Sequence, residues 1–245
     1  MILLRSALFN VYAVLVTVPL ALLAVLTFPF KAEFRYWLIA RQWAKAIVWG
    51  AKVICGIRYE VKGWDNVPHS GVIFTPKHQS RWETMALPSM IPLLCFVYKR
   101  ELHYIPFFGW SIALMAMVPI DRSSGKEALE QVVLRGGERL REGWNMVLFP
   151  EGTRVRVGET RRYKAGGALL AIRTNTPVVP VAHNAGDCWP RDTFIKRPGL
   201  ITLSFGQPIL PEGLSVEQLN AKIEEWVEGE MRRLFPHQYI KASRS

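Results

Sequence analysis

Cysteine is scarce in this 245-residue chain, and its three copies lie far apart at Cys55, Cys95 and Cys188. An odd number of cysteines with no CxxC pair excludes a disulfide framework and a thiolate zinc site. Because disulfides persist mainly in oxidising compartments, this usage fits a reducing compartment such as the cytoplasm. We expect all three thiols to pack as small apolar side chains.

Signatures of bound cofactors are missing too. The sequence contains no HExxH, no DxD cluster, no GxGxxG and no Walker loop, which are motifs that hold a catalytic metal or the phosphates of a nucleotide. No recognised nucleic-acid motif appears either. We therefore expect no metal, no cofactor and no nucleic-acid partner.

Acidic residues are few. The chain has 20 Asp and Glu against 31 Lys and Arg, which gives a net charge of +11. A strongly basic chain suits anionic partners such as an anionic membrane lipid or a phosphorylated substrate. The cations gather beside the N-terminal apolar segment and in the loop 154–164, not along one helix. The charge alone leaves open a basic membrane-binding protein without catalysis.

Charge is absent from residues 6–30, a stretch rich in Leu, Val and Ala. A helix of about 20 apolar residues crosses the ~30 Å hydrocarbon core of a bilayer. A cleaved signal peptide is the alternative, but the run is longer than a usual signal-peptide core and no clear A-x-A cleavage site follows. The pattern favours a retained anchor.

The segment 31–62 changes character, with seven Lys and Arg against Glu33 and Glu60, interleaved with Trp and Tyr. Basic helices with aromatic side chains suit the headgroup layer, where the cations meet anionic lipid. The positive-inside rule places the chain after Lys31 on the cytoplasmic face, and we expect a bacterial inner membrane. Pro29 separates the two helices, so a full span and a hairpin in one leaflet both remain open.

Residues 58–235 have the sequence pattern of one α/β domain. Short β-rich runs alternate with helical stretches, which predicts an α/β fold with a mixed, mostly parallel sheet flanked by helices. A membrane-embedded two-helix segment, 1–57, precedes this domain, and a polar, loose tail, 236–245, follows it. Strands are expected at 72–75, 94–98, 117–120, 146–149, 178–182 and 200–205, and helices at 82–90, 125–142, 166–174 and 216–235.

His78 and Glu83 stand out at the end of the first of these strands. Imidazole titrates near neutral pH, so His78 suits a general base. The two side chains meet only if His78 precedes the helix and Glu83 lies in its first turn. Glu83 can then hold the imidazole tautomer, as the carboxylate of a catalytic triad does. Alternatively, Ser80 and Glu83 form a capping box and nothing more.

Four stretches of the sequence resemble the blocks of the glycerolipid acyltransferases. His78 to Glu83 is similar to their HX4D signature, in an HX4E form. KREL at 99–102 with IPFFG at 105–109 resembles the second block, FPEGTR at 149–154 the third, and VVPVA at 178–182 the fourth. By the order and spacing of these blocks, the chain is identified as a member of the 1-acyl-glycerol-3-phosphate acyltransferase family.

The resemblance implies acyl transfer from acyl-CoA or acyl-carrier protein to the sn-2 hydroxyl of a lysophospholipid acceptor, giving phosphatidic acid. It implies His78 as base paired with Glu83, where the family more often has Asp. It leaves another acceptor open, such as a lyso-ornithine lipid or glycerol 3-phosphate. The implied substrate-binding residues are Arg154, Lys99 and Arg100 for the phosphate, and Glu151, Gly152 and Thr153 for positioning. Glu151 is expected to orient Arg154 or to bind the glycerol hydroxyl.

Overall fold

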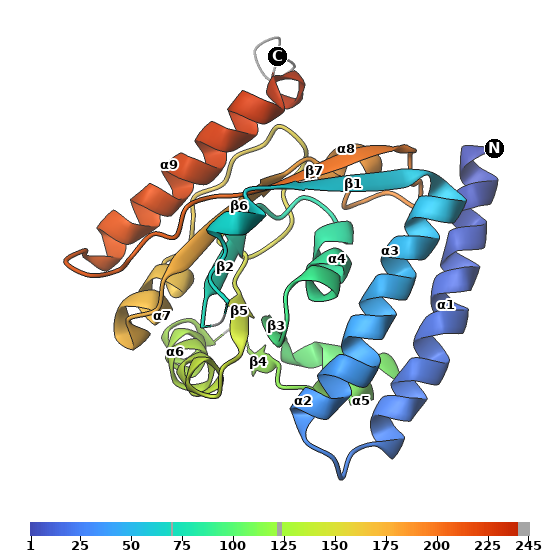
Figure 1. Ribbon diagram of the computed structural model, residues 1–245, viewed down its shortest axis with the longest axis horizontal. Helices are drawn as coiled ribbons and strands as arrows, with labels where there is room; N and C mark the ends of the chain where they lie inside the picture. The colour runs from blue at the N-terminus through green and yellow to red at the C-terminus, as the bar shows by residue number, and fades with distance from the viewer. Residues whose placement is uncertain (70, 122–123, 240–245) are drawn as a thin grey trace.

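A seven-stranded sheet forms the centre of the molecule (Figure 1). The computed structural model describes residues 1–69, 71–121 and 124–239. Within these residues the strand order is β1-β7-β6-β2-β5-β3-β4. The strands are β1 (Ile57–Lys62), β2 (Ile73–Pro76), β3 (Leu94–Lys99), β4 (Val118–Ile120), β5 (Asn145–Val147), β6 (Val178–His183) and β7 (Gly199–Phe205).

Every neighbouring pair of strands is parallel except β6 and β7, which are antiparallel. The central strands β2 and β6 are buried along their whole length, which explains their near-continuous apolar sequences. The predicted mixed, mostly parallel α/β sheet is confirmed. Strand β1 escaped prediction as a strand because it lies at the sheet edge and most of its residues are polar and exposed.

Helices cover both faces of the sheet (Figure 1). One side carries α6 (Lys126–Arg141), α7 (Gly166–Thr174) and α9 (Val216–Leu234), and the other carries α4 (Trp82–Met90). Two short helices were not predicted, α5 (Phe108–Ala113) and α8 (Ala185–Cys188). Each has at most six residues, too few for a helical period to appear in the sequence.

The N-terminal segment consists of two antiparallel helices that stand beside α4 (Figure 1). Helix α1 (Ile2–Leu26) leads through a short α2 (Ala32–Arg35) and a π-helical turn (Tyr36–Ala40) into α3 (Arg41–Cys55). In the described part of the chain, α1 is the helix long and apolar enough to cross a membrane, and most of that stretch is not buried by the protein. Helix α3 is shorter and buries one face against α1 and α4.

Arg35 corrects one interpretation of the basic segment, because its guanidinium does not face lipid. The side chain is buried. It donates to the carbonyl oxygens of Thr27 at 3.1 Å and Phe28 at 3.0 Å, and also to that of Phe30. Its Nε and Nη2 atoms donate to the carbonyl of Leu114, at 2.9 and 2.6 Å. Arg35 therefore ties the turn after α1 to the end of α5.

The start of the expected tail, 236–239, is packed and not loose. Gln238 is buried, and its Nε2 atom donates to Asp187 Oδ1 at 3.1 Å. Its Oε1 atom accepts a hydrogen bond from Gln79 at 3.1 Å. The rest of the expected tail, 240–245, lies outside the described residues.

Candidate active site

His78 and Glu83 meet across the loop between β2 and α4. The Nδ1 atom of His78 lies 2.9 Å from Oε1 of Glu83. His78 precedes the helix and Glu83 occupies its first turn, the arrangement that the sequence required for contact. The extra methylene of Glu relative to Asp does not prevent it.

One oxygen of Glu83 serves several donors. Besides His78, its Oε1 atom accepts the backbone N–H of Gln79 at 3.1 Å and of Ser80 at 2.8 Å. Burial would raise the pKa of this carboxyl, but the imidazoles of His183 and His78 and the N–H of Ser80 outweigh it and hold the pKa below its usual range. Glu83 is therefore a buried carboxylate anchored from three sides.

The capping box is only half formed. Glu83 reaches back to the N–H of Ser80 as a capping residue would. The hydroxyl of Ser80, however, accepts from the N–H of Trp82 at 3.0 Å and donates to the carbonyl of Trp189 at 2.5 Å. Ser80 is buried with both bonds made, which argues against it as a nucleophile.

The backbone of the His78 loop is fixed by neighbours distant in sequence. The N–H of Lys77 donates to the carbonyl of Val181 at 2.9 Å. The carbonyl of Lys77 lies 2.6 Å from Nε2 of His183, whose Nδ1 accepts the N–H of Ala185 at 3.2 Å. His183 therefore donates to the loop through Nε2, and burial lowers its pKa. This geometry gives it a structural role.

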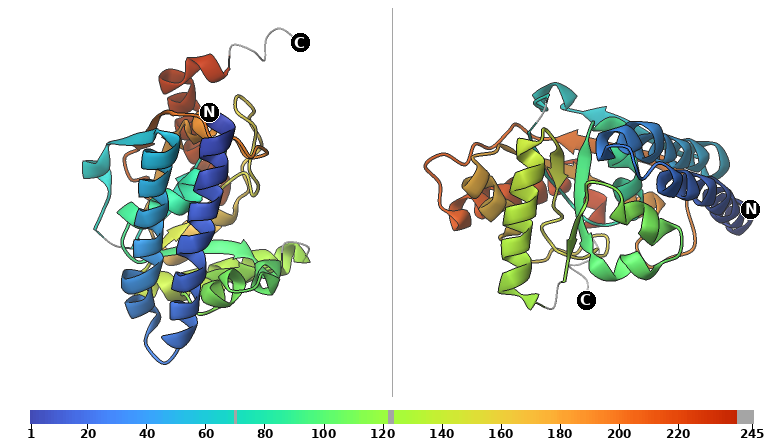
Figure 2. Two further views of the ribbon diagram at one scale, coloured as in Figure 1. Left: turned by 90° about the vertical axis from the view of Figure 1, so that its right-hand side faces the viewer. Right: turned by 90° about the horizontal axis from the view of Figure 1, so that it is seen from below.

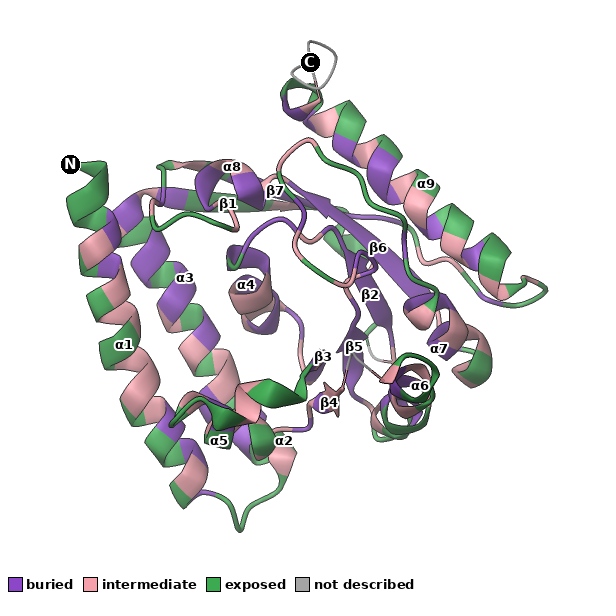
Figure 3. Cartoon of the chain, turned by 180° about the vertical axis from the view of Figure 1, so that it is seen from behind, coloured by how far each residue is buried: buried purple, intermediate pink, exposed green. Residues whose placement is uncertain are grey.

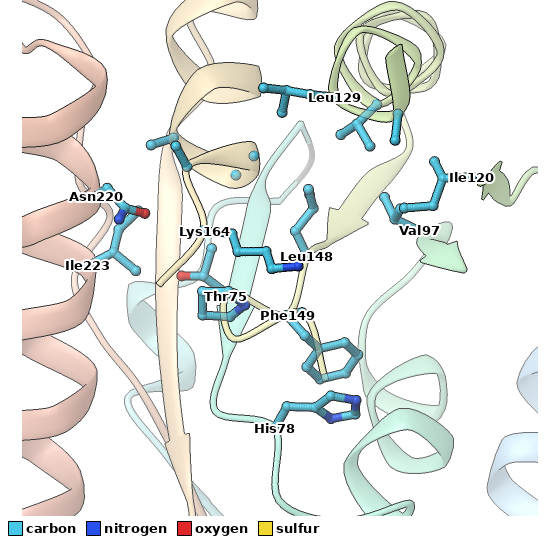
Figure 4. A pocket seen from close by; sticks show the side chains of 18 residues that line it. Thr75, His78, Val97, Ile120, Leu129, Leu148, Phe149, Lys164, Asn220 and Ile223 are labelled. Carbon is cyan, nitrogen blue, oxygen red and sulfur yellow. The ribbon is translucent and has the colours of Figure 1, made fainter. Parts of the chain in front are cut away.

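The imidazole of His78 stacks on the ring of Phe149, with 3.7 Å between the ring centroids. Both side chains lie at one end of a cavity of about 280 Å³ (Figure 4). The walls of this cavity are mainly apolar side chains of β3, β4, α6 and α9. The stack holds the ring plane of His78, and the cavity gives a substrate access to it.

Lys164 was not predicted as a site residue, yet it reaches into this cavity (Figure 4). Its side chain extends toward Leu148 and Phe149. Gly152 lies beside it with a φ of +68°, and a Cβ at Gly152 would come within 3.0 Å of the Lys164 side chain. Glycine is needed here for both the left-handed backbone and the close approach, as expected for the turn after β5. The sequence marked Lys164 only as one of several cations in the loop 154–164.

Arg154 lines a second cavity, of about 570 Å³, between the N-terminal helices, α4 and α5. Its Nε atom donates to the carbonyl of Ser80 at 3.1 Å. The walls of this cavity include Leu20 of α1, Trp43 of α3 and Ile112 of α5. Arg154 thus lies beside the loop of His78, bonded to Ser80, and with Arg81 it brings positive charge to a mainly apolar cavity.

Lys99, Arg100 and Thr153 are not among the described residues that line either cavity. All three are exposed, and Arg100 forms a surface ion pair with Asp121 at 3.3 Å. The structure therefore does not bring these predicted phosphate and positioning residues into the cavities.

Glu151 corrects a further interpretation, because it neither contacts Arg154 nor faces a cavity. It is fully buried, with its Oε1 atom 3.4 Å from Nζ of Lys77. The same ammonium lies 2.6 Å from Oε1 of Glu228 on α9, which also accepts from the hydroxyl of Tyr163 at 3.1 Å. Burial raises the pKa of Glu151 to about 7, against the opposing charge of Lys77. Local sequence gave no signal for Lys77 or Glu228.

Comparison with known proteins places this chain in a family. A family model described as acyltransferase matches residues 58–184. The chain is 41% identical, over 213 residues, to the 1-acyl-sn-glycerol-3-phosphate acyltransferase of Pseudomonas aeruginosa, covering 86% of this chain and 82% of that protein. The protein of the same name from Saccharomyces cerevisiae is 28% identical over 200 residues, covering 80% of this chain and 64% of that protein.

A solved structure shows the same fold. The crystal structure of the 1-acyl-sn-glycerophosphate (LPA) acyltransferase PlsC from Thermotoga maritima matches with a TM-score of 0.71 and 24% identity. The match covers 96% of this chain and 99% of that one, so it includes the two N-terminal helices as well as the sheet.

Proposed function

The chain belongs to the family of 1-acyl-sn-glycerol-3-phosphate acyltransferases, and on this premise we propose how its own residues transfer the acyl group. The donor is an acyl thioester of CoA or of acyl-carrier protein. The acceptor is the sn-2 hydroxyl of 1-acyl-glycerol-3-phosphate, and the product is phosphatidic acid. The contact between His78 and Glu83 at 2.9 Å carries this proposal.

His78 is the general base. The hydrogen bond from Nδ1 to Glu83 keeps the ring proton on that nitrogen, so that Nε2 takes the proton of the acceptor hydroxyl. The alkoxide oxygen attacks the thioester carbonyl, and a tetrahedral intermediate forms. Its collapse breaks the C–S bond, and the leaving thiolate receives the proton from Nε2. Glu83 stabilises the imidazolium between these steps.

Arg154 binds the acceptor phosphate in this proposal. A guanidinium grips phosphate oxygens with two parallel N–H groups, and Arg154 lies in an apolar cavity that suits a lipid chain. Lys164 is the cation that reaches the smaller cavity, which His78 also lines. Lys99 and Arg100 remain a proposed outer phosphate contact at the surface.

Membrane attachment completes the proposal. Residues 1–57 form the anchor, and 58–235 form the catalytic domain on the cytoplasmic face of a bacterial inner membrane. The exposed apolar face of α1 supports attachment. The Lys and Arg residues that follow it support the cytoplasmic orientation.

The test is turnover of detergent-solubilised protein with lysophosphatidic acid and an acyl-CoA, measuring thiol release and phosphatidic acid. The His78→Ala variant runs alongside, and its membrane binding should be unchanged. Phosphatidic acid from the wild type alone supports both the reaction and the base. If neither works with acyl-CoA, acyl-carrier protein replaces it, and failure with both donors overturns the proposed acceptor. Wild-type turnover by His78→Ala overturns the mechanism.

A further inference from the structure

Large apolar side chains crowd the surface of residues 104–110, which run from the turn after β3 into the first residues of α5. Tyr104 is 83% exposed, Trp110 is 50% exposed, and Ile105 and Phe107 are also exposed. Single exposed apolar residues are common on proteins, whereas a cluster of them within one short segment marks an interaction site.

The segment is held rigidly in this exposed form. Phe107 has a φ of +62°, a left-handed conformation that a bulky residue adopts only when its surroundings impose it. The N–H of Gly109 donates to the carbonyl of Ile105 at 2.7 Å, and the N–H of Ser111 to that of Phe107 at 2.9 Å. A Cβ at Gly109 would lie only 2.3 Å from the carbonyl oxygen of Leu102. The chain therefore accepts backbone strain while presenting aromatic rings to the outside.

This surface is continuous with the N-terminal helices. Helix α5 packs against α1, and it lies beside the C-terminal half of that helix (Figure 2). Arg35 links the end of α5 to the turn after α1 through buried hydrogen bonds. Seen from behind, exposed residues run from α1 onto this segment (Figure 3). The exposed apolar residues of the turn and the following helix are Phe28, Phe30, Phe34, Trp37 and Leu38.

We propose that residues 104–110 form a second membrane-contacting segment, which rests on the bilayer beside α1. The occupant is lipid because the surface continues the apolar face of α1, whose length suits the hydrocarbon core. Tyr104 and Trp110 have the amphipathic rings that favour the headgroup layer. The inference rests on the proposed membrane attachment and goes beyond the anchor 1–57.

The contact explains where the larger cavity lies. Its wall contains Ile105 and Phe108 from this region and Leu20 and Ala21 from α1. With both segments in the bilayer, a lipid acceptor reaches the cavity without its chain crossing water. The segment then orients the active site toward the membrane as well as adding apolar contact area.

Fluorescence of a labelled cysteine tests the proposal without any need for turnover. The native Cys55, Cys95 and Cys188 are buried, so a polarity-sensitive dye reacts with an introduced surface cysteine at Tyr104→Cys. Phe30→Cys is the control for the turn after α1. Leu134→Cys, on the exposed face of α6 at 62% exposure, is the aqueous control. The protein is reconstituted in phosphatidylcholine and phosphatidylglycerol vesicles with or without nitroxide-labelled lipid.

The dye at 104 should shift to the blue on reconstitution and be quenched by the lipid nitroxide as strongly as the dye at 30. The dye at 134 should be quenched by aqueous iodide alone. A dye at 104 that behaves like the one at 134 overturns the proposal. Shielding from both quenchers also overturns it, because that result indicates a protein contact.

Activity provides a second readout in the Tyr104→Ser and Trp110→Ser double variant. Neither residue lines a cavity. KM for lysophosphatidic acid presented in vesicles should rise several-fold, while turnover of a short-chain acceptor dissolved in water should not change. An equal loss of activity with both acceptors overturns the proposal. If the wild type is inactive with both acceptors, the proposed reaction is wrong, and the fluorescence measurement still tests the membrane contact.

Discussion

The ammonium of Lys77 lies 2.6 Å from the carboxylate of Glu228, 151 residues further along the chain. This ion pair is buried and connects the loop that carries His78 to the C-terminal helix α9. Glu151 shares the same ammonium at 3.4 Å. The loop that carries His78 is therefore supported by a charged network that extends to the C-terminal helix of the domain.

Breaking this pair on one side should destabilise the fold. Lys77→Met leaves two buried carboxylates without a cation, and Glu228→Met leaves Lys77 with Glu151 alone. Loss of one partner of a buried pair typically costs about 3–5 kcal/mol. The double variant should lose less than the sum of the single variants, because removing Lys77 and Glu228 together leaves only Glu151 without its cation. Urea unfolding of the four proteins gives the coupling, and strictly additive losses would contradict it.

Replacing Glu151 should alter how stability depends on pH. Burial raises the pKa of Glu151 to about 7 from 4.5, so the folded protein retains a proton that the unfolded chain releases. This contribution is fully present below pH 4.5 and is lost as the pH rises through 7. The Glu151→Gln variant lacks this titration. The free energy of unfolding of the wild type, relative to the variant, should fall between pH 5 and 8. If the free energy of unfolding depended on pH in the same way in both proteins, the raised pKa of Glu151 would be refuted.

Glu83 should act on kcat more than on KM. Glu83→Gln removes the charge that stabilises the imidazolium, and loss of the corresponding charge in a serine protease triad costs about 10⁴-fold in kcat. Glu83→Asp keeps the charge but draws the carboxylate back from three donors, so we expect an intermediate loss. Steady-state kinetics with both variants measures this. A Glu83→Gln enzyme with wild-type kcat would leave Glu83 as a helix cap only.

Arg154→Ala should raise KM for a phosphate-bearing acceptor about 10- to 100-fold, as expected from the ~1.5–3 kcal/mol of a hydrogen bond to a charged group. Arg154→Lys keeps the positive charge but loses the two parallel N–H groups of the guanidinium. Its KM should lie between those of the wild type and Arg154→Ala. Arg156→Ala, an exposed cation in the same loop, is the matched control and should leave KM unchanged. An unchanged KM in Arg154→Ala would indicate either an acceptor without phosphate or a phosphate bound by other residues.

Much of the candidate site could be predicted from short stretches of the sequence. The contact between His78 and Glu83 follows from a strand end, a short loop and a first helical turn, all within eleven residues. Gly152 was predicted for the same reason, because its backbone conformation is a local property of the turn after β5. Lys164 had only a weak signal, because a basic loop does not show which of its cations points inward.

The sequence by itself determined the α/β fold, the order of the motif blocks and the two N-terminal helices, since each depends on apolar periodicity and spacing within short windows. Only the tertiary structure showed that Glu151 turns inward to Lys77, that Glu228 reaches the same ammonium, and that Arg35 is buried. These contacts join residues far apart in sequence. Which cation is buried and which stays in water depends on packing across the sheet, and charge and spacing along the chain do not encode it.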